Sequence, residues 1–310
     1  MDEAAVSSGV SGTVGVIGLG IMGGAMAEAI LKSGRKVVGF DVDAKALQRL
    51  EAAGGSTCDS AGQVAVLADT VLISLSTSAA LAQVVQQIAV ADSGKGAERL
   101  LVLETSTLPI ADKDAAQAIL GKSGIALMDC PISGTAERLK DRAWTVFCSG
   151  PEAAYQRARN LFSLFTDNAP FVGPFGNGTK MKLAANHLVA IYNVACAEVV
   201  VLARKMGLDP QQVLDQFGGS PVIGTGVMRL RMPFMIRREY LPATMKVEVW
   251  QKDMQVIGDM AKSVHCPTPL FDACRPIYTA AMAQGFGQED TASVNEVLGS
   301  MAGVGRAAAP

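Results

Sequence analysis

A lysine and an asparagine stand one helical turn apart, directly after a glycine-rich break in the middle of the chain. Gly176 and Gly178 mark the break, and Lys182 and Asn186 follow at positions that a helix places on one face. A helix N-terminus disfavours a cation and burial acts in the same direction, so we expect the pKa of Lys182 to be lowered towards neutrality. Such an amine could take a proton from an alcohol and return it to a carbonyl.

The same helix face continues to Asn193, seven positions after Asn186. We expect these three polar side chains to face another domain and to form one wall of a cleft. The alternative is that Lys182 is a solvated surface lysine, as most lysines are.

A glycine turn near the start of the chain provides the second chemical signal. Gly18, Gly20 and Gly23 follow the apolar run Val14 to Ile17 and precede a helical pattern. Gly18 permits a tight turn, Gly20 lets a pyrophosphate approach the backbone, and Gly23 allows close helix packing. The turn therefore predicts a dinucleotide site, the alternative being a structural turn that binds no nucleotide.

An acidic residue ends the next predicted strand. Asp41 stands 21 positions after Gly20, close to the spacing of about 20 that is typical of a carboxylate on the adenosine ribose. A carboxylate there accepts from the 2′-hydroxyl and repels a 2′-phosphate, so we predict NAD rather than NADP. The alternative is that Asp41 only caps the strand.

Short β-rich runs alternate with longer helical patterns over the first half of the chain. The predicted strands are Val14 to Ile17, Lys36 to Phe40, Thr70 to Ser74, Leu100 to Leu103, Ile125 to Met128, Thr145 to Cys148 and Pro170 to Val172. The predicted helices are Met22 to Lys32, Ala44 to Ala53, Ala79 to Val90, Ile110 to Leu120 and Glu152 to Phe165. This alternation indicates an α/β class with a parallel, doubly wound sheet.

The pattern changes after Val172, where Gly and Pro punctuate the chain and only helical periodicity follows. We predict a disordered N-terminus at 1–12, a Rossmann domain at 13–173, and an all-α domain at 174–306 that serves substrate binding and oligomerisation. The apolar excess of that second domain favours a homodimer or a homotetramer.

Composition narrows the classes of partner. The 310 residues are 49% hydrophobic and 18% charged with a formal net charge of −2, which indicates a globular protein without general attraction to nucleic acid or membrane. We interpret the basic cluster Arg229 to Arg238 as a solvated helix face or subunit contact rather than a polyanion site.

The six cysteines form no C-x-x-C pair and no metal-ligand spacing with the two histidines, so we predict reduced, packed thiols and no metal. We expect His187, His265, Trp144 and Trp250 to serve packing. The start of the chain lacks a secretory signal, and polar residues interrupt the apolar stretch Leu183 to Ala203, so a cytoplasmic protein is expected.

Several motifs together resemble the β-hydroxyacid dehydrogenase family, which includes 3-hydroxyisobutyrate, tartronate semialdehyde and L-threonate dehydrogenases. In family order they are the turn Gly18-Leu19-Gly20-Ile21-Met22-Gly23, the loop Asp129-Cys130-Pro131-Ile132-Ser133-Gly134-Thr135, the pattern Gly176-x-Gly178-x-x-x-Lys182-x-x-x-Asn186, and the pair Lys252-Asp253.

The resemblance implies a role for each matched residue. Ser133 and Gly134, with Thr135 beside them, would bind the substrate carboxylate, Lys182 would transfer the proton, and Asn186 would position the substrate. The cofactor residues implied in addition to the glycine turn and Asp41 are Leu75, Ser76, Thr107 and Lys252.

The resemblance predicts NAD-dependent oxidation of a small hydroxy acid, or the reverse reduction. Three departures from the family pattern stand out: Thr135 replaces a glycine, Glu104 replaces an aspartate, and Ser76 replaces a proline. Thr135 adds a side chain near the carboxylate site and weighs against 3-hydroxyisobutyrate itself. An imine reductase on the same scaffold and a non-catalytic NAD-binding protein are the alternatives. Lys182 argues against the first, and the intact set Ser133, Lys182 and Asn186 argues against the second.

Overall fold

The computed structural model describes residues 12–91, 100–134, 139 and 141–304. Most of the predicted disordered segment 1–12 and the substrate-loop residue Thr135 lie outside the described residues. The chain divides into two compact units, Met1–Lys182 and Leu183–Pro310, which are described in turn.

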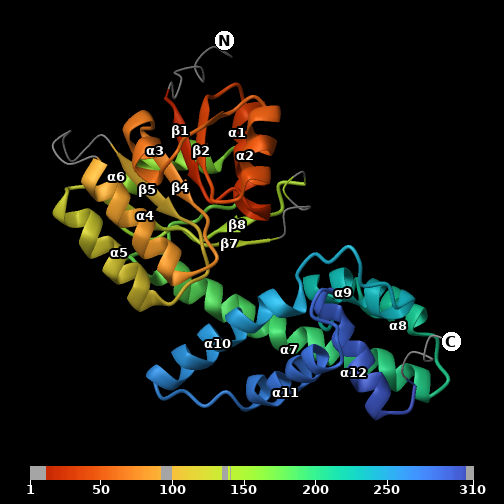
Figure 1. Ribbon diagram of the computed structural model, residues 1–310. Coiled ribbons are helices and arrows are strands. Elements are labelled where there is room, and N and C mark those ends of the chain that lie inside the picture. Colours follow the sequence, from red (N-terminus) through yellow and green to blue (C-terminus); the bar gives the residue numbers. More distant parts are fainter. Residues whose placement is uncertain (1–11, 92–99, 135–138, 140, 305–310) are drawn as a thin grey trace, which may run out of the picture. The chain divides into compact units, whose positions relative to one another are not determined.

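Unit 1 alternates strands and helices as far as β6 (Figure 1), and its five predicted helices and the first five predicted strands occur in the predicted order. Its elements are β1 (Val14–Ile17), α1 (Ile21–Lys32), β2 (Val37–Phe40), α2 (Ala44–Ala52), β3 (Ser56–Thr57), α3 (Ala61–Leu67), β4 (Thr70–Ile73), α4 (Ser78–Ala91), β5 (Leu101–Glu104), α5 (Ile110–Lys122), β6 (Ala126–Asp129), β7 (Ile132–Ser133), β8 (Thr145–Val146) and α6 (Glu152–Phe162).

The main sheet of unit 1 has the order β3-β2-β1-β4-β5-β6, with all of its described pairs parallel. The order reverses between β1 and β4, which creates a crevice at the carboxyl ends of the strands where such sheets bind nucleotides. This topology confirms the prediction of a doubly wound Rossmann sheet.

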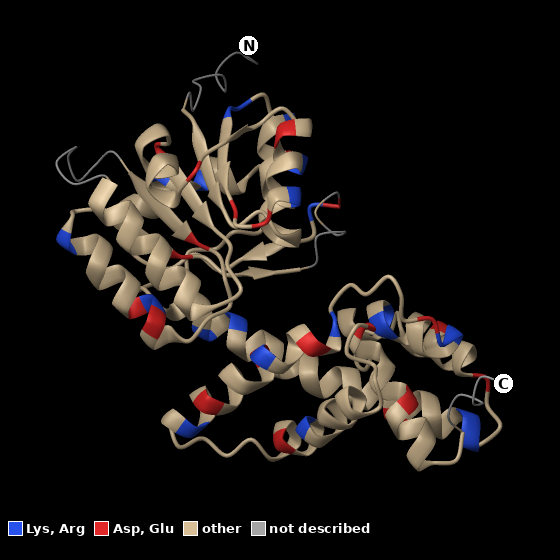
Figure 2. Cartoon of the chain, in the orientation of Figure 1, with Lys and Arg blue, Asp and Glu red and all other residues tan. Residues whose placement is uncertain are grey.

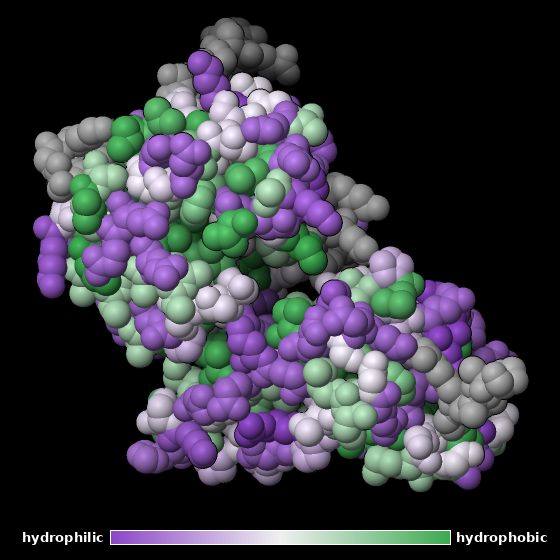
Figure 3. Space-filling model, in the orientation of Figure 1, coloured by the Kyte–Doolittle hydropathy of each residue, from purple (hydrophilic) through white to green (hydrophobic). Residues whose placement is uncertain are grey.

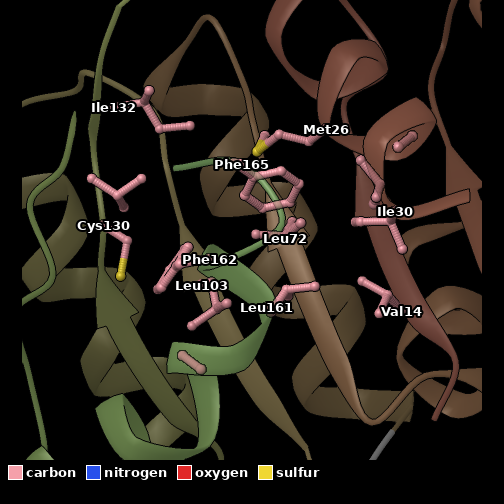
Figure 4. Packing of buried hydrophobic residues seen from close by; sticks show 14 of the residues in the cluster. Val14, Met26, Ile30, Leu72, Leu103, Cys130, Ile132, Leu161, Phe162 and Phe165 are labelled. Carbon is pink, nitrogen blue, oxygen red and sulfur yellow. The ribbon is translucent and has the colours of Figure 1, made fainter. Parts of the chain in front are cut away.

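Alternate residues of each strand enter two separate cores. Leu72, Leu103 and Met128 join the core under α1, α2 and α6, and Figure 4 shows Leu72 and Leu103 beside Phe162 and Phe165. Their strand neighbours enter the core on the other face, under α3, α4 and α5. Burial of both faces explains why these strands are mostly apolar.

Two of the predicted strands do not belong to the main sheet. Thr145 to Cys148 contributes only β8, which pairs antiparallel with β7 in a separate ribbon. Pro170 to Val172 is not a strand and forms only the isolated bridge between Phe171 and Cys148. Sequence periodicity gives a strand's faces but not its partner, and the short segments β3 and α3 were not predicted.

Unit 2 is helical throughout the part of the chain that the structure describes. Its elements are most of α7 (Asn177–Lys205), then α8 (Pro210–Phe217), α9 (Gly226–Arg237), α10 (Val247–Ser263), α11 (Pro269–Ala283), the 3₁₀ turn η2 (Thr291–Ser293) and α12 (Val294–Met301). Val200, Met232, Trp250 and Phe271 lie in its core, and His187 stacks on Phe271 with ring centroids 5.2 Å apart. The packing roles predicted for Trp250 and His187 are confirmed, whereas His265 is exposed.

Helix α7 is long and apolar enough to cross a membrane by length and composition alone, although 44% of its most apolar window is buried inside the protein. Asn193 is 1% exposed and donates to the Tyr278 hydroxyl and to the Thr291 carbonyl. These bonds fit a core helix. They also correct the prediction that Asn193 lines a cleft, since its amide nitrogen donates both of its hydrogen bonds inside unit 2.

Charges are mixed on the surface of both units. Figure 2 shows Lys and Arg interspersed with Asp and Glu, and the face drawn in Figure 3 mixes apolar with polar side chains. Within the basic cluster of α9, Arg231 is buried and its Nη1 lies 2.5 Å from Asp290 Oδ1. Arg237 pairs with Glu239. Arg238 Nε also lies 3.8 Å from Glu296 Oε1, so three arginines of the cluster have acidic partners, which favours a structural role over polyanion binding.

Candidate active site

The glycine turn joins β1 to α1 at the reversal of strand order. A Cβ on Gly18 would lie 2.1 Å from the Ser74 carbonyl oxygen, and one on Gly23 would lie 1.8 Å from the Gly18 oxygen. A Cβ on Gly20 would meet nothing within 4 Å. Packing therefore requires glycine at the first and third positions, while the open space above Gly20 fits a nucleotide that approaches the backbone. These residues fit a dinucleotide.

Asp41 does more than end its strand. Its Oδ2 accepts from the Leu19 N–H at 2.5 Å, and its Oδ1 accepts from the Asp43 N–H at 2.8 Å. The carboxylate therefore holds the middle of the glycine turn. It stands beside the turn where a ribose hydroxyl would be recognised.

The other predicted cofactor residues of unit 1 follow β4 and β5, at the same edge of the sheet as the glycine turn. The Leu75 N–H donates to the Ser106 hydroxyl at 2.8 Å, which links the two loops. Ser76 is exposed, and Thr107 is half-buried between the buried Ser106 and Leu108.

The predicted carboxylate site lies on the β7–β8 ribbon. Ser133 is half-buried and pairs with Thr145, and the next residue, Gly134, is exposed with φ 148°. A Cβ on Gly134 would lie 2.5 Å from the buried ring of Trp144, so the turn requires glycine. The core role predicted for Trp144 is confirmed.

Two buried side chains of unit 1 cap the start of α7. The Asp129 carboxylate accepts from the Thr179 N–H at 2.7 Å and from its hydroxyl at 2.8 Å, while the Ser149 hydroxyl accepts from the Gly178 N–H at 2.9 Å. The helix starts at the predicted break. Lys182 lies in its second turn and is half-buried, so the helix dipole acts on it less than we expected, because that effect fades within the first turn.

Asn186 lies one turn after Lys182 and is 4% exposed. Its amide donates to Asp253 Oδ2 at 2.9 Å, and the Lys252 ammonium lies 3.2 Å from Asp253 Oδ1. Asp253 therefore fixes which way the amide of Asn186 points, a role that was not predicted although the Lys-Asp pair was recognised. Nothing in the spacing from 186 to 253 reveals this contact.

A buried charge cluster behind the candidate site was also missed. Lys113, Glu104 and Asp129 are all 0% exposed, and the Lys113 ammonium lies 2.5 Å from Glu104 Oε2 and 2.8 Å from Asp129 Oδ1. Burial lowers the pKa of Lys113, but the two carboxylates outweigh it and the pKa is raised, so this lysine is charged. The only sequence signal was Glu104 itself, which departs from the family pattern and has the length to reach Lys113.

The thiol of the substrate loop, on Cys130, neighbours a second buried thiol on Cys148. Cys130 and Cys148 are both 0% exposed, and all six cysteines are free, as predicted. Burial raises the pKa of Cys130 well above its ordinary value, and the neighbouring Cys148 adds to the shift. The Cys130 thiol therefore stays protonated.

A parallel sheet of this order with a glycine turn at its reversal defines a Rossmann-type dinucleotide-binding enzyme. Residues 13–173 match the family model described as the NAD binding domain of 6-phosphogluconate dehydrogenase. Residues 176–298 match the model described as NAD-binding of NADP-dependent 3-hydroxyisobutyrate dehydrogenase. The chain belongs to the β-hydroxyacid dehydrogenase family, and it is an NAD(P)-dependent hydroxyacid dehydrogenase.

Individual relatives agree with this assignment. The L-threonate dehydrogenase of Cupriavidus necator is 29% identical, over 93% of this chain and 97% of that protein. The structure of 3-hydroxyisobutyrate dehydrogenase from Salmonella typhimurium matches with a TM-score of 0.80 and 27% identity, covering 92% of this chain and 99% of that one. An imine reductase from Pseudomonas sp. matches with a TM-score of 0.60 and 19% identity over 93% and 99% of the two chains, which shows the shared fold alone.

Proposed function

We propose that this enzyme oxidises a small β-hydroxy acid to the corresponding semialdehyde or keto acid with NAD, or catalyses the reverse reduction. The observation that carries the proposal is on α7, where Lys182 stands one turn before an asparagine whose amide is held by a buried carboxylate. The capped start of the helix would hold Lys182 in position and the glycine turn would hold the cofactor, and a hydride transfer needs both groups in a fixed geometry.

In this proposal Ser133 and the backbone N–H of Gly134 bind the substrate carboxylate. Lys182 takes the hydroxyl proton during oxidation and returns it during reduction. Asn186 holds the reacting group, because Asp253 leaves its amide little freedom to rotate. The glycine turn and Asp41 would hold NAD, which would supply the acceptor for the hydride of the carbinol carbon.

The NAD preference rests on Asp41. A phosphate on the 2′-hydroxyl would bring negative charge beside a carboxylate that already holds the Leu19 and Asp43 amides and so has little freedom to move away. We expect Kd for NADPH to exceed Kd for NADH by about tenfold or more. Equal affinities would refute this preference.

The named relatives suggest which hydroxy acids to try first. L-Threonate, 3-hydroxyisobutyrate and 2-(hydroxymethyl)glutarate appear in the names of related enzymes, and all carry a hydroxyl near a carboxylate. A panel of these acids and other small C3 and C4 hydroxy acids, each assayed by NADH absorbance, would identify the substrate. A cyclic imine in the same panel, with NADPH, tests the imine-reductase alternative.

The role of Lys182 is tested by Lys182→Ala. Turnover should fall by about a hundredfold or more while Kd for NADH stays near that of the wild type. Lys180→Ala is a matched control, because Lys180 is an exposed lysine of the same helix. Unchanged turnover of Lys182→Ala would refute the proposed role.

We also propose a homodimer or a homotetramer in the cytoplasm. Leu188, Tyr192 and Leu202 on α7, and Met206 directly after it, are 48%, 37%, 55% and 59% exposed. Their spacing is that of one seam of a helix pair, which supports burial against a second copy. Leu202→Asp should lower the mass measured by light scattering, whereas Lys205→Gln should not.

A further inference from the structure

Lys113 of α5 is the one fully buried lysine of the described residues, and three groups surround its ammonium. It donates to the Ser106 carbonyl at 2.7 Å and contacts Glu104 and Asp129. Glu104 ends β5, Asp129 ends β6, and Ser106 is the second residue of the loop after β5. A single charge thus joins the carboxyl ends of two strands at the edge of the sheet that holds the candidate site.

From this ammonium one chain of bonds leads to the predicted cofactor loops. Glu104 Oε1 accepts from the Ser106 N–H at 2.9 Å, so both backbone groups of Ser106 are held by the cluster. The Ser106 hydroxyl in turn accepts from the Leu75 N–H. Thr107, which the family resemblance places beside the nicotinamide, follows directly after this fixed residue.

A second chain of bonds leads to the proton-transfer residue. Asp129 Oδ1 contacts Lys113 and also accepts from the Thr179 hydroxyl, while Asp129 Oδ2 accepts from the Thr179 N–H. Thr179 lies three positions before Lys182 on α7, and the rigid helix carries its position to that residue.

The charges of the cluster suit this arrangement. Two carboxylates and one ammonium leave one negative charge. Asp129 carries it to the start of α7, where it accepts from an N–H group that has no acceptor within the helix and lies at the positive end of the helix dipole. Lys113 therefore keeps a second carboxylate from remaining unpaired in the interior.

We propose that Lys113 is a positioning residue for the dehydrogenase reaction, whose ammonium holds the Ser106–Thr107 turn and the start of α7 in one fixed geometry. This inference rests on the proposed function, because it assigns Thr107 to the cofactor and Lys182 to the proton. Lys113 itself touches no substrate in this proposal. Displacement of either group by an ångström would slow hydride transfer.

The first test removes the clamp without leaving an unpaired charge. In Lys113→Met combined with Glu104→Gln, Asp129 still caps α7 and the net charge of the cluster is unchanged. We expect kcat to fall by about tenfold or more with the melting temperature close to that of Lys122→Met, a control at an exposed lysine of the same helix. A double variant with wild-type kcat would overturn the proposal.

The second test cuts each branch separately and leaves Lys113 and both carboxylates in place, so it does not depend on the fold of the double variant. Ser106→Ala should raise Kd for NADH by about threefold or more, because Leu75 loses its acceptor. Thr179→Val should lower kcat by about threefold or more and leave Kd for NADH unchanged. Variants that change only the melting temperature would overturn the proposal.

Failure of the proposed function would look different. A wild-type chain that binds NADH but oxidises no acid of the panel would refute the function. The NADH affinity of Ser106→Ala would still decide whether the cluster positions the cofactor loops, because that measurement needs no substrate.

Discussion

Adding one methyl group at two glycines of the same turn should separate binding from folding. At Gly23 the new Cβ would lie 1.8 Å from the Gly18 oxygen, so the backbone must move by about 1.2 Å to reach even 3.0 Å. Overpacking of this kind costs about 1–3 kcal/mol, and each kcal/mol lowers the melting temperature of a domain of this size by about 2–4 °C. Gly23→Ala should therefore melt about 2–12 °C below the wild type.

Gly20→Ala should behave in the opposite way. Gly20 has φ −64°, which alanine adopts readily, and its Cβ would meet no protein atom within 4 Å. Loss of a glycine N-cap costs at most about 1 kcal/mol, so the melting temperature should change little. The same methyl group would occupy the path of the pyrophosphate, and Kd for NADH should rise by about tenfold or more, equivalent to ~1.4 kcal/mol.

Thermal melts by circular dichroism and fluorescence titrations with NADH measure the two effects on the same samples. Wild-type NADH affinity in Gly20→Ala would show that the nucleotide does not pass over this residue. An unchanged melting temperature in Gly23→Ala would refute the packing argument.

Three further predictions concern unit 2. Asp253→Asn should lower kcat by about tenfold without weakening NADH binding, because the amide of Asn186 loses its charged acceptor. Steady-state kinetics that show no change in kcat would contradict this prediction. Arg231→Met should lower the free energy of unfolding by about 3–5 kcal/mol in urea titrations, since the buried Asp290 carboxylate would lose its counter-charge. Adding Asp290→Asn should recover part of that loss. Burial raises the pKa of Cys196 from 9.0 to about 11, so above pH 9.0 the folded state keeps a proton that the unfolded state loses, and the free energy of unfolding should fall as the pH rises. The fall should be smaller in Cys196→Ala. Equal pH dependence in the wild type and the variant would contradict this assignment.

The sequence predicted those parts of the molecule that depend on local order. The glycine turn, the carboxylate at the end of β2 and the start of α7 lie within short segments whose spacing reports their geometry. The alternation of strands and helices likewise predicted the α/β class and the parallel, doubly wound sheet, because parallel strands need a crossover connection, which is usually a helix.

Contacts between distant segments could not be predicted in the same way. Nothing in the local sequence distinguishes Lys113 from the other lysine of α5, and only the contacts of its ammonium with Glu104 and Asp129, which end β5 and β6, identify it as a buried ion. Asn193 shares a helix face with Lys182 in the sequence, yet unit 2 closes over it. The antiparallel pairing of β8 with β7 could not be predicted either, because the alternation of apolar residues in a strand does not indicate its partner strand.

The bond from Leu19 to Asp41 has a consequence for engineering coenzyme use. The carboxylate that would discriminate against a phosphorylated ribose is also the acceptor that keeps the loop in shape. Exchanging Asp41 for a small neutral residue would remove the repulsion of a 2′-phosphate, but it would also leave the Leu19 N–H without its acceptor. The glycine turn would then be held less firmly for both coenzymes. A successful redesign must therefore supply a replacement acceptor for Leu19 before it adds a positive charge for the phosphate.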